Sequence, residues 1–325
     1  MTVTPLFCDV AMAERIERAE AQLMDAAGRA AHQRAGDPHG FTRDIGGGVA
    51  IFAGPGSPFN KIAGLGFGGL PSGAELDDVE QAFAAAGSPV QAEVATLADP
   101  AVGELLTGRG YRLVSFENVL GRVVGDAPTT PNGIGAQPSP DEEADEVSGL
   151  PRPNEEPGEI SARPRPNEKA GGNSSGIEVR LSSDAAADEW FALMADAVAD
   201  VDTQGQPAHE DFPRQIVVDA LHDMVAAGCR RYEARRDGVL AGGGSMRVAG
   251  RVAQLTGAAT SLAHRRRGAQ TALLAARLAD AAGAGCDIAV VATQPGSKSQ
   301  QNVQRAGFHL LYTRAVLVKG TPSSV

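Results

Sequence analysis

The sequence predicts an α/β protein with two similar domains in tandem, each a mixed, mostly antiparallel central sheet flanked by helices, joined by a disordered linker. The chain has 325 residues, and domains usually contain about 100–200 residues, so two domains are expected. A segment of strongly biased composition, residues 126–176, divides the chain. On both sides of it the apolar residues predict a similar order of strands and helices, which ends in a long strand.

We expect the N-terminal domain to occupy residues 1–125 and to begin with a long helix over 13–31. That segment is rich in alanine and in Glu/Arg pairs, which favour a helix. Short apolar runs predict strands, and amphipathic spacing predicts shorter helices between them. The expected strands are 49–53, 62–67, 90–96 and 113–124, and the expected helices are 77–86 and 100–107.

Residues 126–176 contain nine prolines, seven glycines and no aromatic residue, with ten acidic against four basic side chains. Such a segment buries too little apolar surface to offset its conformational entropy, so we expect a disordered linker. The pentapeptide Pro151–Glu155 recurs as Pro164–Glu168. Composition favours linker growth by duplication, with a repeated peptide ligand for a partner as the alternative.

The C-terminal domain is expected over residues 177–325. Alternation at 177–181 predicts a strand, and residues 182–184 offer N-caps for a helix through Trp190. A second helix is expected at 212–224. Three strand-like runs with short turns then predict two antiparallel hairpins, over 229–235, 239–248 and 251–262.

The most informative segment is the loop that follows these strands and leads directly into a helix. It reads His264-Arg265-Arg266-Arg267-Gly268-Ala269-Gln270, and the helix is expected over 271–281. The first turn of a helix presents unpaired N–H groups and a partial positive charge, which together bind anions such as phosphate. Gly268 lets the backbone approach a ligand closely. A solvated basic turn is the plainer interpretation of the arginines taken alone.

The segment Arg265-Arg266-Arg267-Gly268-Ala269-Gln270 resembles the pyrophosphate loop of the GNAT superfamily of acyl-CoA-dependent N-acetyltransferases, whose pattern is Arg/Gln-x-x-Gly-x-Gly/Ala. Gln270 replaces the last small residue, which should be tolerated because backbone amides make most of that contact. Downstream, 287–293 resembles the fifth strand of the family, and 299–308 resembles its fourth helix and the Gly-Phe corner. Residues 310–318 would supply the closing strands, so the resemblance covers roughly 177–319.

The resemblance implies acetyl-CoA as cosubstrate and no metal. The pyrophosphate would lie on the backbone amides of 267–271, and the three guanidinium groups would meet the adenosine phosphates. In the family the fourth strand splays from the fifth, the pantetheine arm pairs with its exposed edge, and the fourth helix faces that arm. The residues implied in cofactor binding are Ser261, Leu262, Ala263, Arg265, Arg266, Arg267, Gly268, Ala269, Gln270, Thr271, Ser299 and Asn302.

The implied reaction is direct attack of an amine on the thioester. It needs a deprotonated amine, an N–H donor for the oxyanion, which strand backbone supplies in this family, and a proton or other stabilisation for the thiolate. Many members take that proton from a Tyr five residues before the Phe of the Gly-Phe corner, but Val303 stands there. Ser299, bulk water and Tyr312 are the alternatives, although Tyr312 also fits a packed strand position.

The carboxylate that the family usually carries on its fourth strand is missing too, because 252–262 contains neither Asp nor Glu. Glu210 is the first choice of general base, since its region borders the acceptor cleft in the family. Trp190 could line that cleft, although a lone Trp on a helix is usually a core residue. The alternative bases are His209, Asp211, Glu233 and His264, for each of which a surface or packing role is the simpler interpretation.

The N-terminal domain resembles a second, degenerate GNAT copy, because Arg109-Gly110-Tyr111 stands where Ala306-Gly307-Phe308 stands. Its phosphate-loop position, 68–74, lacks arginine and contains Pro71, which has no N–H to donate. We therefore expect weak binding of acetyl-CoA there, or none. Residues 64–69 also match G-x-G-x-x-G, but the dinucleotide fingerprint must open a helix at once, so glycines at a strand end are the simpler interpretation.

The composition argues against nucleic-acid and membrane partners and against a cysteine-based metal site. The 40 Asp and Glu against 29 Lys and Arg give a formal charge of −11, which argues against nucleic acid as a partner and mildly favours cationic acceptors. The three scattered cysteines form no metal-site or disulfide pattern, which suits a reducing cytoplasm. No apolar run approaches the roughly 20 residues that span a bilayer, and no signal pattern is present, so no membrane partner is expected.

The sequence therefore predicts a cytoplasmic, acetyl-CoA-dependent N-acetyltransferase, a monomer or homodimer, with one working site in the C-terminal domain. The acceptor would be a small-molecule or peptide amine, and the N-terminal domain would shape or cover the acceptor cleft. Because the usual Tyr and carboxylate are absent, a non-catalytic acyl-CoA-binding sensor or regulatory module is the alternative. A scaffold that acts through the duplicated linker peptide is a further alternative.

Overall fold

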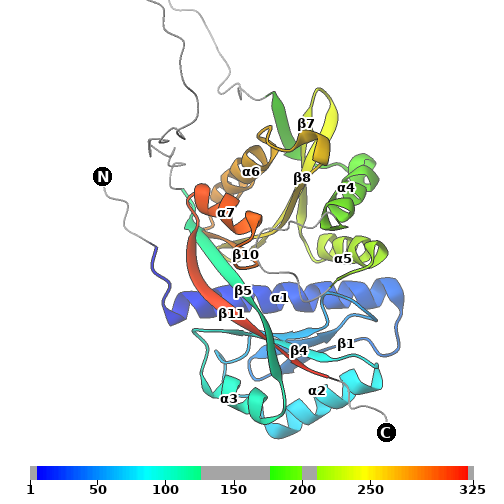
Figure 1. The fold of residues 1–325 in the computed structure, drawn as a ribbon, viewed down its shortest axis with the longest axis vertical. Coiled ribbons are helices and arrows are strands. Elements are labelled where there is room, and N and C mark those ends of the chain that lie inside the picture. The colour runs from blue at the N-terminus through cyan, green and yellow to red at the C-terminus, as the bar shows by residue number, and fades with distance from the viewer. Residues whose placement is uncertain (1–5, 126–175, 200–210, 321–325) are drawn as a thin grey trace, which may run out of the picture.

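A computed structural model describes residues 6–125, 176–199 and 211–320, which form two α/β halves that share one central sheet (Figure 1). The predicted linker, apart from Gly176, lies outside the described residues, and so does the duplicated pentapeptide. His209 and Glu210 lie outside them as well. Within the described ranges, no helix is long and apolar enough to cross a membrane.

The N-terminal half starts with the 26-residue helix α1, which local chemistry delimits at both ends. The Asp9 side chain accepts a hydrogen bond from the Met12 N–H at 2.8 Å, and Gly36 ends the helix in the left-handed region at φ 63°. The elements of this half are α1 (Val10–Ala35), β1 (Phe41–Ile45), β2 (Gly48–Phe52), β3 (Lys61–Ala63), α2 (Gly73–Ala85), β4 (Val90–Ala95), α3 (Ala101–Gly108) and β5 (Arg112–Val123).

The C-terminal half repeats this order after an additional strand and helix at its start. The elements are β6 (Ile177–Leu181), the short 3₁₀ helix η1 (Asp184–Ala186), α4 (Ala187–Ala199), α5 (Arg214–Ala226), β7 (Arg230–Arg236), β8 (Val239–Ala249), β9 (Val252–Thr260), η2 (Leu262–His264), α6 (Ala269–Gly283), β10 (Ile288–Thr293), α7 (Lys298–Arg305) and β11 (His309–Lys319). Every helix and strand that the sequence predicts within the described ranges is present, with ends that shift by a few residues.

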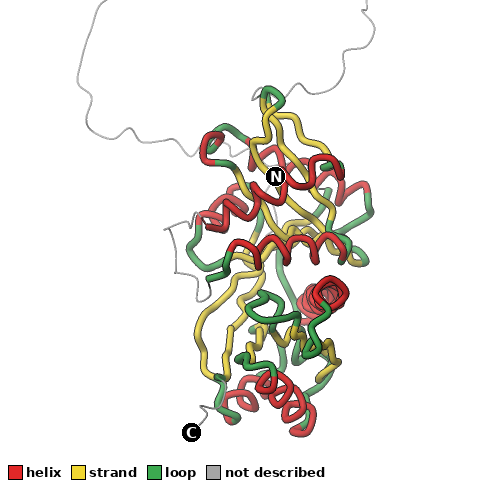
Figure 2. Tube along the Cα trace, turned by 90° about the vertical axis from the view of Figure 1, so that its right-hand side faces the viewer, coloured by secondary structure: helices red, strands yellow, loops and turns green. Residues whose placement is uncertain are grey.

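The central sheet has eleven strands in the order β1-β2-β3-β4-β11-β5-β10-β9-β8-β7-β6. Eight of the ten neighbouring pairs are antiparallel, and the two parallel pairs, β3–β4 and β9–β10, hold equivalent places in the two halves. This arrangement confirms the mixed, mostly antiparallel sheet. Figure 2 shows long strands that connect the upper and lower halves of the molecule.

The two halves exchange their last strands. Strand β5, from the N-terminal half, pairs with β10 through Asn118–Val123, whereas β11, from the C-terminal half, pairs with β4 through Arg314–Lys319. The two exchanged strands pair with each other along their length. The expectation that residues 310–318 close the C-terminal domain's own sheet is therefore wrong, because β5 already occupies the edge of β10.

Helix α1 lies between the halves and is viewed end-on in Figure 2. Leu23 and Met24 share one apolar cluster with Ala220 and Cys229 of the C-terminal half. At its C-terminal end, Arg34 binds Asp223 through two hydrogen bonds of 2.8 Å. Helix α1 thereby fixes α5 against the N-terminal half.

Candidate active site

The central feature of the C-terminal half is the separation of its two parallel strands. β9 and β10 pair at Val252–Gln254 and Ile288–Val290, and the pairing stops there although β9 runs on to Thr260 and β10 to Thr293. Beyond that point β9 stays paired with β8, and β10 with β5. The strands therefore splay, as the resemblance implied, and among the described residues no strand pairs with this edge of β9 over 255–260.

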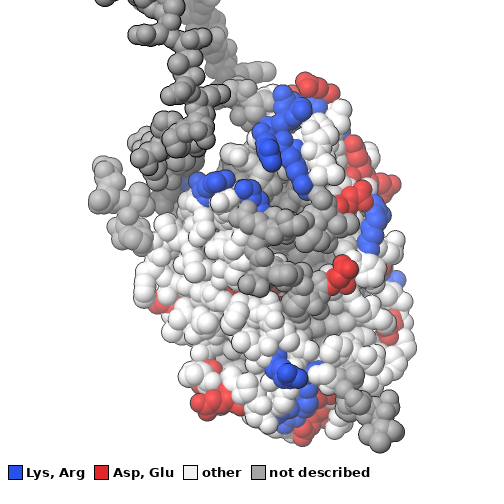
Figure 3. Space-filling model, viewed as in Figure 1, with Lys and Arg blue, Asp and Glu red and all other residues white. Residues whose placement is uncertain are grey.

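The loop after β9 brings the three consecutive arginines to the start of α6. The Ser261 hydroxyl and His264 Nδ1 are 2.8 Å apart, and this contact closes the first turn of the loop, η2. Arg266 adopts a left-handed backbone at φ 60°, a conformation that costs a non-glycine residue free energy. Arg265, Arg266 and Arg267 are exposed. Lys and Arg side chains gather on this face over the region of α6 and α7 (Figure 3).

Gly268 caps α6 in the left-handed region at φ 89°, with no side-chain hydrogen bond to the first turn. Its carbonyl accepts from the Ala272 N–H at 3.0 Å, so the three preceding N–H groups, of 269–271, have no partner within the helix. These donors and the three arginines point to one ligand chemistry, an anion with several oxygens.

The equivalent helix of the N-terminal half is closed by its own side chains. Ser72 caps α2 and accepts from the Glu75 N–H at 3.2 Å, while the Glu75 carboxylate accepts from the Ser72 N–H at 2.7 Å. Hydrogen bonds to Ser72 hold the pKa of Glu75 below its ordinary value. A negative carboxylate thus occupies the place where a phosphate would have to bind.

The glycine-rich segment 64–69 does not open a helix, since α2 starts at Gly73. Gly66 has a φ of 85°, and a Cβ there would lie 2.9 Å from the Ala98 Cβ. These glycines allow the turn after β3 to pack closely, which agrees with the simpler interpretation of the motif.

The candidate acid Ser299 and the candidate cofactor contact Asn302 lie on α7, one turn apart. Ser299 is exposed and Asn302 is half-buried. Val303, at the position of the usual Tyr, is 5% exposed and packs in the core of the C-terminal half. Helix α7 therefore brings no phenol to this site.

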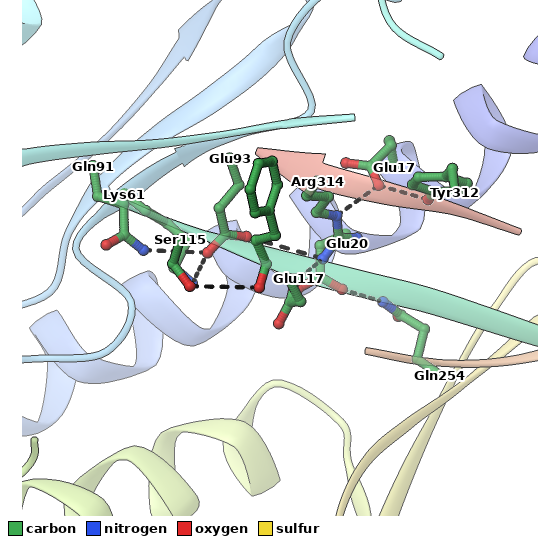
Figure 4. Close-up of polar contacts among 11 residues, drawn as sticks. Glu17, Glu20, Lys61, Gln91, Glu93, Ser115, Glu117, Gln254, Tyr312 and Arg314 are labelled. Atoms are coloured by element: carbon green, nitrogen blue, oxygen red, sulfur yellow. Dashed lines mark hydrogen bonds and ion pairs between the residues drawn. The ribbon is translucent and has the colours of Figure 1, made fainter. Parts of the chain in front are cut away.

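Tyr312 belongs to a buried polar cluster between the halves and not to the loop before α6, which corrects its candidacy as an acid. Its hydroxyl donates to Glu17 Oε1 at 2.6 Å (Figure 4). Burial and the nearby Glu17 carboxylate raise the pKa of Tyr312 far above its ordinary value. Such a phenol holds structure and is a poor proton donor.

We call this group the seam cluster. In it, Arg314 donates to Glu17 and to Glu117, both at 2.8 Å, and is 2% exposed (Figure 4). Gln254, the last residue of β9 that pairs with β10, donates to Glu20 at 3.2 Å. The cluster thus reaches the point at which the two strands separate. Its members are Glu17, Glu20, Lys61, Glu93, Glu117, Tyr312 and Arg314.

The other candidates have structural partners. Glu233 is fully buried; although burial alone would raise its pKa, hydrogen bonds from Arg235 and Arg180 hold that pKa below its ordinary value. Trp190 is fully buried and donates to the Tyr232 carbonyl at 2.9 Å, so it is a core residue. Within the described ranges, no group of His, Cys, Asp and Glu could hold a metal ion.

Sequence reasoning missed the seam cluster and one further polar residue, Arg277 of α6. Arg277 is 2% exposed and stands in the apolar stripe formed by Leu273 and Ala281. The available signal was an arginine in line with the apolar residues of an amphipathic helix. An arginine at such a position must find a buried partner, because arginine is almost never buried without one. The seam cluster joins residues some 300 positions apart, so no local pattern could have announced it.

Comparisons with known proteins agree with this fold. Residues 190–308 match the model of the acetyltransferase (GNAT) family. A GCN5-related N-acetyltransferase from Kribbella flavida is 19% identical, with 95% of each chain covered and a TM-score of 0.58. A tandem GNAT protein from the clavulanic acid biosynthesis pathway is 14% identical, with 98% of each chain covered and a TM-score of 0.54. At these identities the two structures establish the fold alone. A search of curated proteins found no match.

Proposed function

Because residues 190–308 form a GNAT acetyltransferase domain, we propose that the protein transfers an acetyl group from acetyl-CoA to an amine, at one site in the C-terminal half. One observation carries the proposal: the uncapped start of α6 and its three arginines directly follow the strand whose edge is left open. This is the arrangement that a ligand with a pyrophosphate at one end and an extended amide chain at the other requires.

In this proposal the pyrophosphate of acetyl-CoA binds the N–H groups of Arg267 to Thr271, and the loop arginines contact the adenosine phosphates. The pantetheine arm extends from Ser261–Ala263 along the open edge of β9 towards Ala258. Ser299 and Asn302 contact the arm from α7. The N-terminal half binds no second acetyl-CoA, since Glu75 already satisfies the start of α2.

The chemistry follows from the needs of the reaction. The amine nitrogen attacks the thioester carbon, the carbonyl electron pair moves to oxygen, and a backbone N–H of β9 stabilises the resulting oxyanion. Collapse of the intermediate breaks the C–S bond and releases the thiolate of coenzyme A. Glu210 removes the amine proton, and Ser299 or water supplies a proton to the thiolate. The acceptor is a small-molecule or peptide amine.

The second candidate function is an acyl-CoA sensor without catalysis. It is favoured by one observation, the core packing of Val303 where the usual proton donor would stand. The two functions share the cofactor site and differ only in turnover.

The cofactor site is tested by calorimetric titration of acetyl-CoA into the full chain. We expect one molecule bound per chain, and a loss of binding when Arg266 and Arg267 are both changed to Glu. The matched control is Arg18→Glu with Arg29→Glu, an equal change of net charge on the exposed face of α1. An equal loss of acetyl-CoA affinity in both double variants would mean that Arg266 and Arg267 act only through the net charge of the protein. A native chain that does not bind acetyl-CoA would refute the proposal.

Turnover is tested by release of free thiol from acetyl-CoA in the presence of a panel of amines. We expect Glu210→Gln to lower kcat about a hundredfold with little change in acetyl-CoA affinity, as is usual for loss of a general base. Asp211→Asn tests the neighbouring alternative base, and Glu178→Gln, an exposed carboxylate of β6, serves as control. An unchanged rate across the pH range would remove Glu210 from the mechanism, and tight binding with no thiol release from any amine would favour the sensor.

A further inference from the structure

Arg277 is a buried cation that the proposed mechanism does not yet use. It is 2% exposed, and within the described residues it makes no ion pair with a carboxylate. Arg314, the other deeply buried arginine of comparable exposure, is paired with three glutamates. Burial lowers the pKa of Arg277 to about 10, which leaves it charged at neutral pH. A desolvated cation is costly unless its hydrogen bonds compensate, so its partners are informative.

Those partners are three backbone carbonyls. Arg277 Nε donates to Leu273 of its own helix at 3.2 Å, and Nη1 donates to Ser245 of β8 at 3.1 Å and to Gly257 of β9 at 3.0 Å. Gly244 makes room for the guanidinium, because a Cβ there would lie 3.2 Å from Cζ. Arg277 thus contacts β8 and β9 at the irregularity in their pairing between Ser245 and Arg247.

The register of β8 and β9 tells where the backbone groups near Gly257 point. The Ser261 N–H donates to the Ala241 carbonyl at 3.0 Å, and this pair is in register with Ser245 and Gly257. In an antiparallel ladder, every second pair of opposite residues is hydrogen-bonded. Ser261 and Ala241 form such a pair, so Gly257 and Ser245 form one as well, and the backbone N–H and C=O of Gly257 point towards β8. The N–H of the next residue, Ala258, points to the opposite side. On that side β10 has already separated from β9.

One peptide unit therefore has Arg277 at its carbonyl end and the open edge of β9 at its N–H end. Hydrogen bonds in a chain polarise one another, and a charged donor on the carbonyl makes the N–H of the same peptide a stronger donor. The effect is greatest in a low-dielectric interior, which is where this guanidinium lies.

We propose that Arg277 is a positioning residue that polarises the Gly257–Ala258 peptide, so that the Ala258 N–H stabilises the negative charge that forms on the thioester oxygen. This inference rests on the proposed function, since it needs acetyl-CoA along β9. Arg277 touches neither substrate nor cofactor. It acts as the attacking nitrogen forms the C–N bond and the carbonyl electron pair moves to oxygen, and it takes no proton.

The test uses acetyl-CoA labelled with ¹³C at the acetyl carbonyl, bound to the full chain in the absence of an amine. A stronger hydrogen-bond donor to the carbonyl oxygen moves the ¹³C resonance of the carbonyl downfield. We therefore expect the resonance of acetyl-CoA bound to the native chain to lie downfield of that of free acetyl-CoA, and we call this difference the displacement. Arg277→Met should remove at least half of that displacement with acetyl-CoA affinity, measured by calorimetry, changed less than threefold. Arg277→Lys keeps the charge but not the two-carbonyl geometry and should give an intermediate displacement.

Two further variants separate polarisation from packing. Tyr232→Phe removes the hydrogen bond from Tyr232 to Asp280 of the same helix, 2.8 Å long, and should leave the resonance unchanged. Gly244→Ala pushes the guanidinium away and should reduce the displacement even if Arg277→Met fails to fold. Equal displacement in the native chain and in every folded Arg277 and Gly244 variant would overturn the inference. Failure of the native chain to bind acetyl-CoA would instead refute the proposed function.

Discussion

Arg266 shows how a single residue can trade stability for a binding surface. Its backbone lies in the left-handed region at φ 60°, where glycine is favoured, yet its side chain is an exposed cation in the loop that we propose binds the phosphates. Among the described residues, Asp237, at φ 52° in the turn between β7 and β8, is the other non-glycine residue in this region. The pair offers a matched comparison of strain with and without a ligand nearby.

We expect Arg266→Gly to raise the free energy of unfolding by about 1 kcal/mol, because it relieves the backbone strain. The same change should weaken acetyl-CoA binding about tenfold through loss of a charge-assisted contact. Thermal unfolding and calorimetry measure the two effects. Asp237→Gly should give a similar gain in stability without any loss of affinity, and a loss of affinity there as well would contradict the assignment of the loop.

Glu20 makes the seam cluster sensitive to pH. Burial raises its pKa, and the neighbouring carboxylates of Glu93 and Glu17 raise it further, while Arg314 opposes them. Because the pKa of Glu20 is higher in the folded chain than in the unfolded chain, its contribution to stability is fully present below the unfolded-state pKa of about 4.3. This contribution is lost as the pH rises through the folded-state pKa.

Glu20→Gln should therefore flatten the fall in unfolding free energy as pH rises above about 4.3, and should keep an acceptor for Gln254. Denaturant unfolding at a series of pH values measures this slope. Glu20→Ala also lacks an ionisable group and must show the same flattened slope even if it is less stable. A native-like slope in both variants would show that Glu20 ionises equally in the folded and unfolded chain.

At the scale of elements, α2 and α6 hold equivalent places in the two halves, but their N-terminal ends are capped differently. Helix α6 begins at a bare Gly268, whereas α2 begins with a reciprocal cap between Ser72 and Glu75. The same position in the fold is thus a helix start without a side-chain cap in one half, which we propose binds the phosphates, and a capped helix start in the other.

Ser72→Ala should cost about 1 kcal/mol of unfolding free energy, as is typical for loss of an N-cap. Acetyl-CoA should still bind once per chain with unchanged affinity. Calorimetric stoichiometry and thermal unfolding test both expectations together. Two binding events in either the native chain or the variant would show that the N-terminal half also accepts the cofactor.

The helices and most strands could be predicted because their patterns are local. Strand β1 escaped because Thr42, Arg43 and Asp44 give it a polar centre without clear alternation. Strand β3 is shorter than predicted, since Gly64 turns the chain at φ 79°. In the candidate site, the loop before α6 and the separation of β9 from β10 could be expected from the resemblance of one motif. The proposed role of Arg277 could not, because it depends on carbonyls of β8 and β9, which are distant from Arg277 in the sequence.

The exchange of β5 and β11 could not be read from the sequence. Both are long apolar strands that follow a short helix and a glycine, and each could complete the sheet of its own half. The choice depends on tertiary contacts such as those of Arg314, which joins β11 to α1 and β5. It makes the two halves one structural unit.

We expect a chain cut within 126–175 to stay together, because each fragment holds a strand that completes the other's sheet. An engineered protease site in that segment, followed by gel filtration under native conditions, tests this. The fragments should elute as one species and separate only in denaturant. The fragment 1–125 expressed alone should fail to give a cooperative unfolding transition, and two stable separate fragments would contradict the exchanged pairing.

The position of β11 also fixes the order in which the protein can be completed on the ribosome. Domains generally fold as they emerge, N-terminal first. Here the sheet of the N-terminal half is completed beside β4 by β11, which is synthesised after the other ten strands of the sheet. Until then β4 presents an open edge, which is the kind of surface that chaperones protect. The sheet of the half that is synthesised first is therefore completed only when the last strand of the other half has been made.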